Sequence, residues 1–271
     1  MALFGVVADI HGNREALEAA LAALDERGAE RIVCLGDVVG YNADPDECVE
    51  LVRRRCAATI AGNHDLIAIG RLDFRRCSKK AEYALRHTRR EIGLEAKAWL
   101  ATLPAHYSFE EGWVLVHGGV RDVQQYMVRP RHIAENAALL RSDFPGARVC
   151  FFGHSHEQKV YRVEDATVEE IEAPQVSLDG SGEYFVNPGS VDASRKHGPR
   201  LAECALYDSS RRTVEFLRLP YDSAAAETKA AVLGYRIDPL TDRLYTLKRR
   251  IIGRVSRART ALQRPHGSQP R

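Results

Sequence analysis

The alternation of strand and helix signals in the first sixty residues constrains the fold of this chain most strongly. Three short apolar runs indicate buried strands, at residues 3–8, 31–35 and 56–60. Two segments with helical spacing separate them, at residues 13–27 and 45–55, and Pro45 stands at the first position of the second helix. This order predicts parallel strands joined by right-handed helical crossovers, and therefore an α/β fold.

The rest of the chain predicts one large domain with helical additions. Residues 66–112 are predicted to contain a charged helical insertion within a domain that spans residues 1–220. Further strand signals follow the insertion, at residues 113–116, 148–152, 159–163, 184–186, 202–207 and 213–219. Short turns join the later ones, which favours antiparallel pairing in a second sheet that faces the first. Residues 221–264 are predicted to form a helical C-terminal extension, followed by a disordered basic tail at residues 265–271.

Composition narrows the class of protein and its location. Apolar residues make up 45% and charged residues 28% of the 271 residues, as in ordinary globular proteins. The net charge of +2 gives no argument for a nucleic-acid partner, and no apolar run approaches the roughly 20 residues that span a bilayer. The first residues lack the features of a secretory signal, and the six cysteines form no CxxC pair. We therefore expect a cytoplasmic protein with buried, reduced cysteines and no membrane contact.

Five short segments are rich in side chains that bind metals, and each directly follows a predicted strand. They are Asp9-Ile10-His11, Gly36-Asp37, Gly62-Asn63-His64-Asp65, Val116-His117-Gly118-Gly119 and Gly153-His154-Ser155-His156. Residues just past the strand ends of an α/β sheet gather along one edge, where ligands bind. A single Asp or His in such a place is usually a turn former or a solvated side chain. Their joint occurrence after five strands instead predicts one shared site.

The donor types in these segments indicate the chemistry of the site. Apart from His64 and Asp65, they supply two carboxylates, four imidazoles and one amide, and no thiolate. Such donors suit first-row metals such as Mn, Fe, Co, Ni or Zn, and the sequence does not distinguish among these. The set is too large for one ion and suits two divalent ions with a bridging carboxylate. Because most of these donors are neutral, the loaded site stays positive and attracts a phosphate group.

The five segments, in this order, resemble the calcineurin-like metallophosphoesterase superfamily. A sixth segment, Asn187-Pro188-Gly189-Ser190-Val191, and residues 36–45 are similar to its bacterial and archaeal phosphodiesterase branch. The resemblance covers residues 3–219 and implies a four-layer α/β/β/α sandwich of two mixed sheets. It also implies hydrolysis of phosphate esters, with a small phosphate ester or a nucleotide as the substrate.

The resemblance also implies the role of each ligand residue. One metal would be held by Asp9, His11 and His156, and the other by Asn63, His117 and His154. Asp37 would bridge the two ions. His64 is the predicted proton donor to the leaving alkoxide, and Asp65 is predicted to orient His64 or to cap the helix that follows, two roles that are compatible.

Substrate contacts and specificity stay more open in the sequence. We expect contacts from Arg195, Asn13 and Tyr41. Arg195 lies in the segment Val191-Asp192-Ala193-Ser194-Arg195, where the family more often has Gly-Gln-Pro-Arg. The alternative role for Arg195 is a solvated charge in a loop. A phosphodiesterase or broad-specificity enzyme is favoured. The alternatives are a serine/threonine-type protein phosphatase, a dinucleoside tetraphosphate hydrolase, a nuclease aided by the basic tail, and a non-catalytic interaction scaffold. Oligomeric state is not predicted.

Overall fold

The first sixty residues fold as three parallel strands with two intervening helices, as the sequence predicts. In the computed structural model the strands are β1 (Leu3–Val7), β2 (Arg31–Cys34) and β3 (Cys56–Thr59), paired in parallel in the order β3-β2-β1. The helices are α1 (Arg14–Glu26) and α2 (Pro45–Arg55). The structure describes residues 2–165, 167–193 and 198–238, and residues up to 235 form one compact unit.

Three later strands extend this first sheet on the other side of β1. They are β11 (Leu201–Asp208), β12 (Thr213–Pro220) and β9 (Gln175–Ser177), which give the order β3-β2-β1-β11-β12-β9. β11 pairs antiparallel with both β1 and β12. The sequence correctly predicts the antiparallel pairing of β11 with β12. The prediction that these two strands belong to the second sheet is wrong, because β11 pairs with the free edge of β1 in the first sheet.

The second sheet also has six strands and mixed pairing. In spatial order they are β4 (His106–Phe109), β5 (Trp113–Val116), β6 (Val149–Phe151), β10 (Glu183–Pro188), β7 (Gln158–Glu164) and β8 (Thr167–Ile171). β6 pairs in parallel with β5 and β10, and the remaining pairs are antiparallel. The sequence did not predict β4, β8 or β9.

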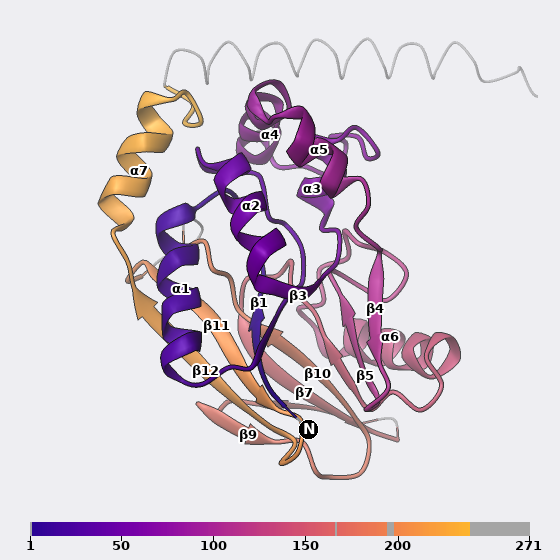
Figure 1. Ribbon diagram of the computed structural model, residues 1–271. Helices are drawn as coiled ribbons and strands as arrows, with labels where there is room; N and C mark the ends of the chain where they lie inside the picture. The colour runs from indigo at the N-terminus through magenta and orange to yellow at the C-terminus, as the bar shows by residue number, and fades with distance from the viewer. Residues whose placement is uncertain (1, 166, 194–197, 239–271) are drawn as a thin grey trace, which may run out of the picture. The chain divides into compact units, whose positions relative to one another are not determined.

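Apolar side chains join the sheets and helices into four layers. Aromatic rings fill the space between the two sheets: the rings of Phe4 and Trp113 lie 4.8 Å apart, and Trp113 also contacts Phe151 and Tyr207. α6 (Pro130–Asp143) covers the outer face of the second sheet, and α1 and α2 cover the outer face of the first (Figure 1). The four-layer arrangement predicted from the sequence is thus confirmed, although α6 itself was not predicted.

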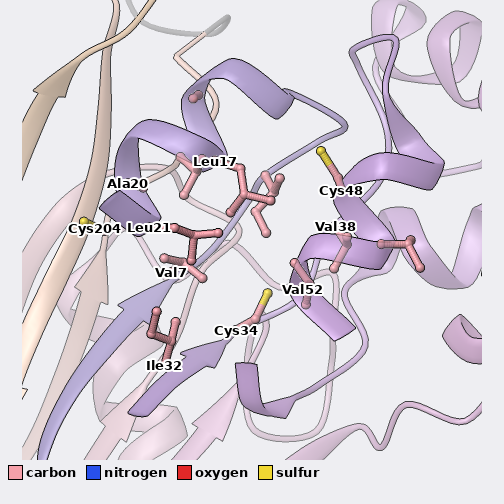
Figure 2. Packing of buried hydrophobic residues seen from close by; sticks show 14 of the residues in the cluster. Val7, Leu17, Ala20, Leu21, Ile32, Cys34, Val38, Cys48, Val52 and Cys204 are labelled. Atoms are coloured by element: carbon pink, nitrogen blue, oxygen red, sulfur yellow. The ribbon is translucent and has the colours of Figure 1, made fainter. Parts of the chain in front are cut away.

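Figure 2 shows the core beneath α1 and α2. Leu21 of α1 points toward Val7 and Ile32 of the first sheet, and Val52 of α2 lies near Cys34. All five side chains are buried. Burial raises the pKa of the Cys34 thiol well above its usual range, so this cysteine behaves as a small apolar residue.

The predicted insertion contains helices and also one strand of the second sheet. α3 (Asn63–Ala68), α4 (Lys79–Glu91) and α5 (Leu94–Leu100) lie together near the top of the view in Figure 1. The predicted range 66–112 is too long for a helical insertion, because residues 106–109 form β4.

The C-terminal extension is described only at its start. α7 (Ser223–Val232) lies within the predicted extension at residues 221–264. Residues 239–264 of that extension and the predicted tail at 265–271 lie outside the described residues. Among the helices that the structure describes, none has the length and apolar character needed to cross a bilayer.

The N-terminus of α4 offers a test of local stability. The Ser78 hydroxyl accepts a hydrogen bond from the Ala81 backbone N–H at 3.2 Å, as an N-cap does. We expect Ser78→Ala to lower the free energy of unfolding by about 1 kcal/mol, because this N–H loses its partner. Urea denaturation measures the effect, and an unchanged midpoint and slope would contradict the capping role.

Candidate metal centre

The side chains predicted as metal ligands come together at one edge of the two sheets. Asp9 and His11 follow β1, Asp37 follows β2, and Asn63 begins α3 just after β3. From the second sheet, His117 follows β5, and His154 and His156 follow β6. All seven residues are buried, the most exposed at 6%. The carboxyl ends of parallel strands meet at the same edge, which is why segments 145 residues apart in the sequence converge here.

The distances between donor atoms are short enough for neighbouring metal ions. His117 Nε2 lies 3.3 Å from Asp37 Oδ2, and Asn63 Oδ1 lies 3.1 Å from the same imidazole nitrogen. On the other side, His156 Nε2 lies 3.4 Å from Asp9 Oδ1. His11 Nε2 lies 3.9 Å from both Asp9 Oδ1 and Asp37 Oδ2.

These donors form three overlapping groups, each able to hold one ion. The groups are Asp9, His11 and His156; Asp37, His117 and His154; and His11, Asp37 and His64, with the donor atoms of each group within 4.8 Å of one another. The first group is one of the predicted ligand sets, and the second shares His117 and His154 with the other predicted set. Asp37 contributes to two of the three groups. Carboxylate oxygens with imidazole nitrogens suit divalent first-row metals, so the residues fit such ions.

The electrostatics of the site favour cation binding. Burial by itself would raise the pKa of Asp37, but the charges of His117, His64 and His11 hold it well below its usual range. Burial would likewise lower the pKa of His117, but Asp37 and Asp9 raise it to about 9. A cation that binds here would compete with a proton for the His117 imidazole, so metal binding depends on pH.

A backbone carbonyl fixes the orientation of the His117 ring. The Nδ1–H of His117 donates to the Leu35 carbonyl at 2.7 Å, which turns Nε2 toward Asp37 and Asn63. Carbonyl partners of this kind commonly set the tautomer of a metal-binding imidazole.

Five of the seven predicted ligands adopt left-handed backbone conformations. Their φ angles are 54° at Asp9, 54° at His11, 53° at Asp37, 63° at His154 and 61° at His156. Such conformations cost roughly 1–3 kcal/mol each and persist where surrounding contacts enforce them. Here the backbone N–H of His154 donates to Asp9 Oδ2 at 2.9 Å, and that of His11 donates to the Asp37 carbonyl at 2.8 Å. The ligand loops thus hold one another in a conformation suited to the site.

The segment that begins at Asn187 forms hydrogen bonds with two of these loops. The Ser190 hydroxyl and the Asp192 backbone N–H both donate to the Asp9 carbonyl, each at 3.0 Å. The Asn187 side-chain amide donates to the Gly153 carbonyl at 3.0 Å. This sixth sequence block therefore supports the ligand loops of both sheets.

His64 lies beside the carboxylate that is predicted to bridge the metals. Its backbone N–H donates to Asp37 Oδ1 at 2.7 Å, and its ring lies 4.5 Å from the ring of His11. A β-carbon at Gly40 would lie 2.4 Å from His64 Nδ1, so only glycine allows this approach. Sequence reasoning did not single out Gly40, although it belongs to the block that resembles the family.

Asp65 contacts the backbone of the loops that carry Asp37 and Asn63. Its carboxylate accepts hydrogen bonds from the backbone N–H groups of Gly62 and Val39, at 3.0 and 3.2 Å. This arrangement corresponds to the helix-capping role considered from the sequence. Burial, and then the charge of Asp37, raise the pKa of Asp65 to about 7.

The three predicted substrate contacts have different surroundings. The Tyr41 ring lies 4.7 Å from His11 and 4.9 Å from His64 and lines a cleft beside the centre. Asn13 instead caps α1 by accepting from the Ala16 N–H and donates to Asp192, and it is 2% exposed. Arg195 lies outside the described residues.

The cleft has a volume of about 490 Å³ and also receives side chains that sequence reasoning missed. Lys80 of α4 and Tyr126 of the loop after β5 both line it, together with Asn63, His64 and His154. Neither Lys80 nor Tyr126 stands in a motif, so no local sequence signal could have identified them.

Comparison with known proteins identifies the family. Residues 2–212 match the family model described as the calcineurin-like phosphoesterase superfamily domain. An uncharacterised protein of Methanocaldococcus jannaschii, MJ0912, is 31% identical over 234 residues, which cover 84% of this chain and 91% of that protein.

Solved structures agree with the family model. A metallophosphoesterase from Sphaerobacter thermophilus has a TM-score of 0.72 at 30% identity, covering 86% of this chain and 94% of its own. A hypothetical protein, PH1004, from Pyrococcus horikoshii OT3 shares the fold at 20% identity, with a TM-score of 0.66 and coverages of 90% and 98%. With the match over residues 2–212, this chain belongs to the calcineurin-like phosphoesterase superfamily and is a hydrolase that acts on phosphate esters.

Proposed function

We propose that this chain hydrolyses phosphodiesters with two divalent metal ions held at the edge of the two sheets. The observation that carries the proposal is the position of Asp37, whose carboxylate takes part in two of the three potential ion-binding groups. The phosphodiester preference is supported by the sequence blocks at residues 36–45 and 187–191, which resemble the phosphodiesterase branch. Manganese is our first candidate among the divalent ions, and we expect the reaction to take place in the cytoplasm.

The ligand residues would divide between the two ions as the resemblance implies. Asp9, His11 and His156 would hold one ion, and Asn63, His117 and His154 the other. Asp37 would contact both. When bound, such a pair of ions supplies a nucleophilic hydroxide near neutral pH and offsets negative charge on the phosphoryl oxygens.

His64 would act as the proton donor to the leaving group. Its imidazole lines the cleft, and the adjacent Asp37 and His11 place it beside the expected position of the phosphate. A positioned general acid contributes roughly 10²–10⁴-fold to a rate, most for leaving groups that are poor without a proton. Asp65 would support His64 indirectly, by fixing the backbone at Gly62 and Val39.

The alternative functions have less support from the residues. A protein phosphatase of this superfamily usually has Arg before Gly-Asn-His, whereas this chain has Ala61 at that place. A non-catalytic scaffold would not need all seven ligand positions and His64 to be filled, as they are here. A dinucleoside tetraphosphate hydrolase differs only in the substrate that the same centre would cleave, so substrate comparison separates it.

Metal removal and a substrate panel test the proposal. We expect the purified protein to cleave bis(4-nitrophenyl) phosphate faster than 4-nitrophenyl phosphate, to lose this activity after chelation, and to regain it with Mn²⁺. The panel adds a cyclic nucleotide, a dinucleoside tetraphosphate and a phosphopeptide. Preference for the phosphopeptide would contradict the phosphodiesterase assignment, and activity that survives complete metal removal would contradict the metal-dependent reaction.

A further inference from the structure

The cleft beside the centre is larger than a phosphate group requires. Its volume of about 490 Å³ lies in the range of sites for small organic ligands. One side is formed by His64 and His154, and the other by the start of α4 and the loop after β5. A substrate whose phosphate sits at the centre can therefore extend its remaining groups into this space.

Contacts across the cleft hold its outer walls together. Arg76, just before α4, donates to both carboxylate oxygens of Asp122 at 2.8 Å and to the Gln124 carbonyl at 2.6 Å. Asp122 and Gln124 belong to the loop after β5. This link fixes the helical insertion relative to the loop that carries Tyr126.

Tyr126 presents an aromatic face in a fixed position next to a predicted metal ligand. Its ring centroid lies 4.0 Å from that of His154, at an interplanar angle of 37°, and 43% of the residue is exposed. Asn136 of α6 fixes the loop, since its amide donates to Gln125 Oε1 at 3.0 Å and its oxygen accepts from the Val120 N–H at 2.7 Å. A ring that is already held in place binds another ring with little loss of entropy.

The charge of the cleft favours an anionic substrate beyond the phosphate itself. Among the described residues that line it are two cations and no carboxylate. The charge of Arg76 is offset by Asp122. Lys80 is exposed and forms no ion pair with any residue in the described ranges, so its charge is available to a ligand.

We propose that Tyr126 and Lys80 form a subsite that selects small aromatic phosphoesters with a second negative group, the chemistry of a nucleotide. The ring of the substrate stacks on Tyr126, and its additional anion pairs with Lys80. This inference rests on the proposed function, because it assumes that the scissile phosphate occupies the neighbouring centre. It assigns the specificity to two elements outside the ligand motifs, α4 and the loop after β5.

Binding of phosphonates tests the aromatic contact without catalysis, since a phosphoesterase does not cleave their C–P bond. Calorimetry on the Mn²⁺-loaded protein compares methylphosphonate with phenylphosphonate. We expect Tyr126→Ala to weaken the binding of phenylphosphonate about fivefold and to leave the affinity for methylphosphonate unchanged. Tyr126→Phe should bind both ligands with the affinity of the wild type. Tyr107→Ala is the matched control, because Tyr107 is 42% exposed and lies in β4. An equal loss for both phosphonates, or no loss, overturns the stacking role.

A third ligand, 4-phosphonobenzoate, tests the charge contact. Because of its added carboxylate, 4-phosphonobenzoate should bind more tightly than phenylphosphonate at low salt. We expect Lys80→Ala to reduce this affinity advantage, the ratio of the two dissociation constants, about threefold. Lys97→Ala, a lysine of α5 outside the cleft, should leave the advantage unchanged. If Lys80→Ala keeps the full advantage of the carboxylate, the role of Lys80 is wrong.

The outcomes separate this inference from the proposed function. Hydrolysis of bis(4-nitrophenyl) phosphate by the wild type, with phosphonate binding that is insensitive to Tyr126 and Lys80, overturns the subsite alone. Ring-dependent and Lys80-dependent binding without hydrolysis of any phosphate ester in the panel supports the subsite as a ligand site and contradicts the catalytic proposal.

Discussion

Replacing Asp37 with Asn is expected to abolish nearly all hydrolysis and to reduce metal binding. The Asp37 carboxylate takes part in two of the potential ion-binding groups, and its pKa is held well below its usual range by the surrounding histidines. An amide has a similar shape but carries no charge, so it would hold two cations poorly. We expect kcat/KM for bis(4-nitrophenyl) phosphate to fall roughly 10³-fold or more.

Metal analysis alongside the kinetics separates this effect from misfolding. Asp37→Asn should bind less than half the metal of the wild type at the same Mn²⁺ concentration, while its circular dichroism spectrum stays unchanged. Asp25→Asn is the control, because Asp25 is exposed, forms a surface ion pair with Arg55 and belongs to none of the three potential ion-binding groups. Wild-type turnover in Asp37→Asn would show that no essential ion depends on this carboxylate.

Replacing His64 with Ala should slow the reaction according to the leaving group. A dinucleotide leaves as an alkoxide that needs a proton, and here we expect a loss of roughly 10²–10⁴-fold. Bis(4-nitrophenyl) phosphate releases a stable nitrophenolate that needs no proton. The decrease in kcat for this substrate should therefore be at least tenfold smaller. The measurement is kcat for both substrates at saturating metal.

Two comparisons make the His64 result interpretable. His64 also belongs to a potential ion-binding group with His11 and Asp37, so the metal content of His64→Ala must be measured. We expect it to equal that of the wild type. His106→Ala, at an exposed histidine of β4, should change neither rate. Equal losses on both substrates would exclude His64 as the proton donor.

Much of the fold was predictable because the strong signals are local. The buried strands β1, β2 and β3 are short apolar runs, and α1 and α2 have regular helical spacing with identifiable ends. By contrast β8 and β9 are largely exposed edge strands without a clear apolar alternation. α6 begins at Pro130 with no side-chain cap and no acidic residue in its first turn, so its start was not recognised. The pairing of β11 with β1 is a long-range choice that no local pattern encodes.

The candidate site shows the same division between local and long-range information. Seven ligand-type residues could be named because each directly follows a strand, and the structure brings all seven to one buried edge. The left-handed backbone at Asp9 and Asp37 could not be predicted, because loops from other strands enforce it. Tyr126 and Lys80 reach the cleft only through tertiary contacts. Asn13, which a motif-based view places in the cleft, has its side chain occupied by the cap of α1 and by Asp192.

Anomalous diffraction from crystals grown with Mn²⁺ would locate the bound ions. A dinuclear centre shared by Asp37 predicts two strong peaks at the sheet edge, with the Asp37 carboxylate contacting both and each ion within about 2.0–2.4 Å of its ligand atoms. A single peak that Asp37 does not contact, or no peak at this edge under conditions that support activity, would contradict it.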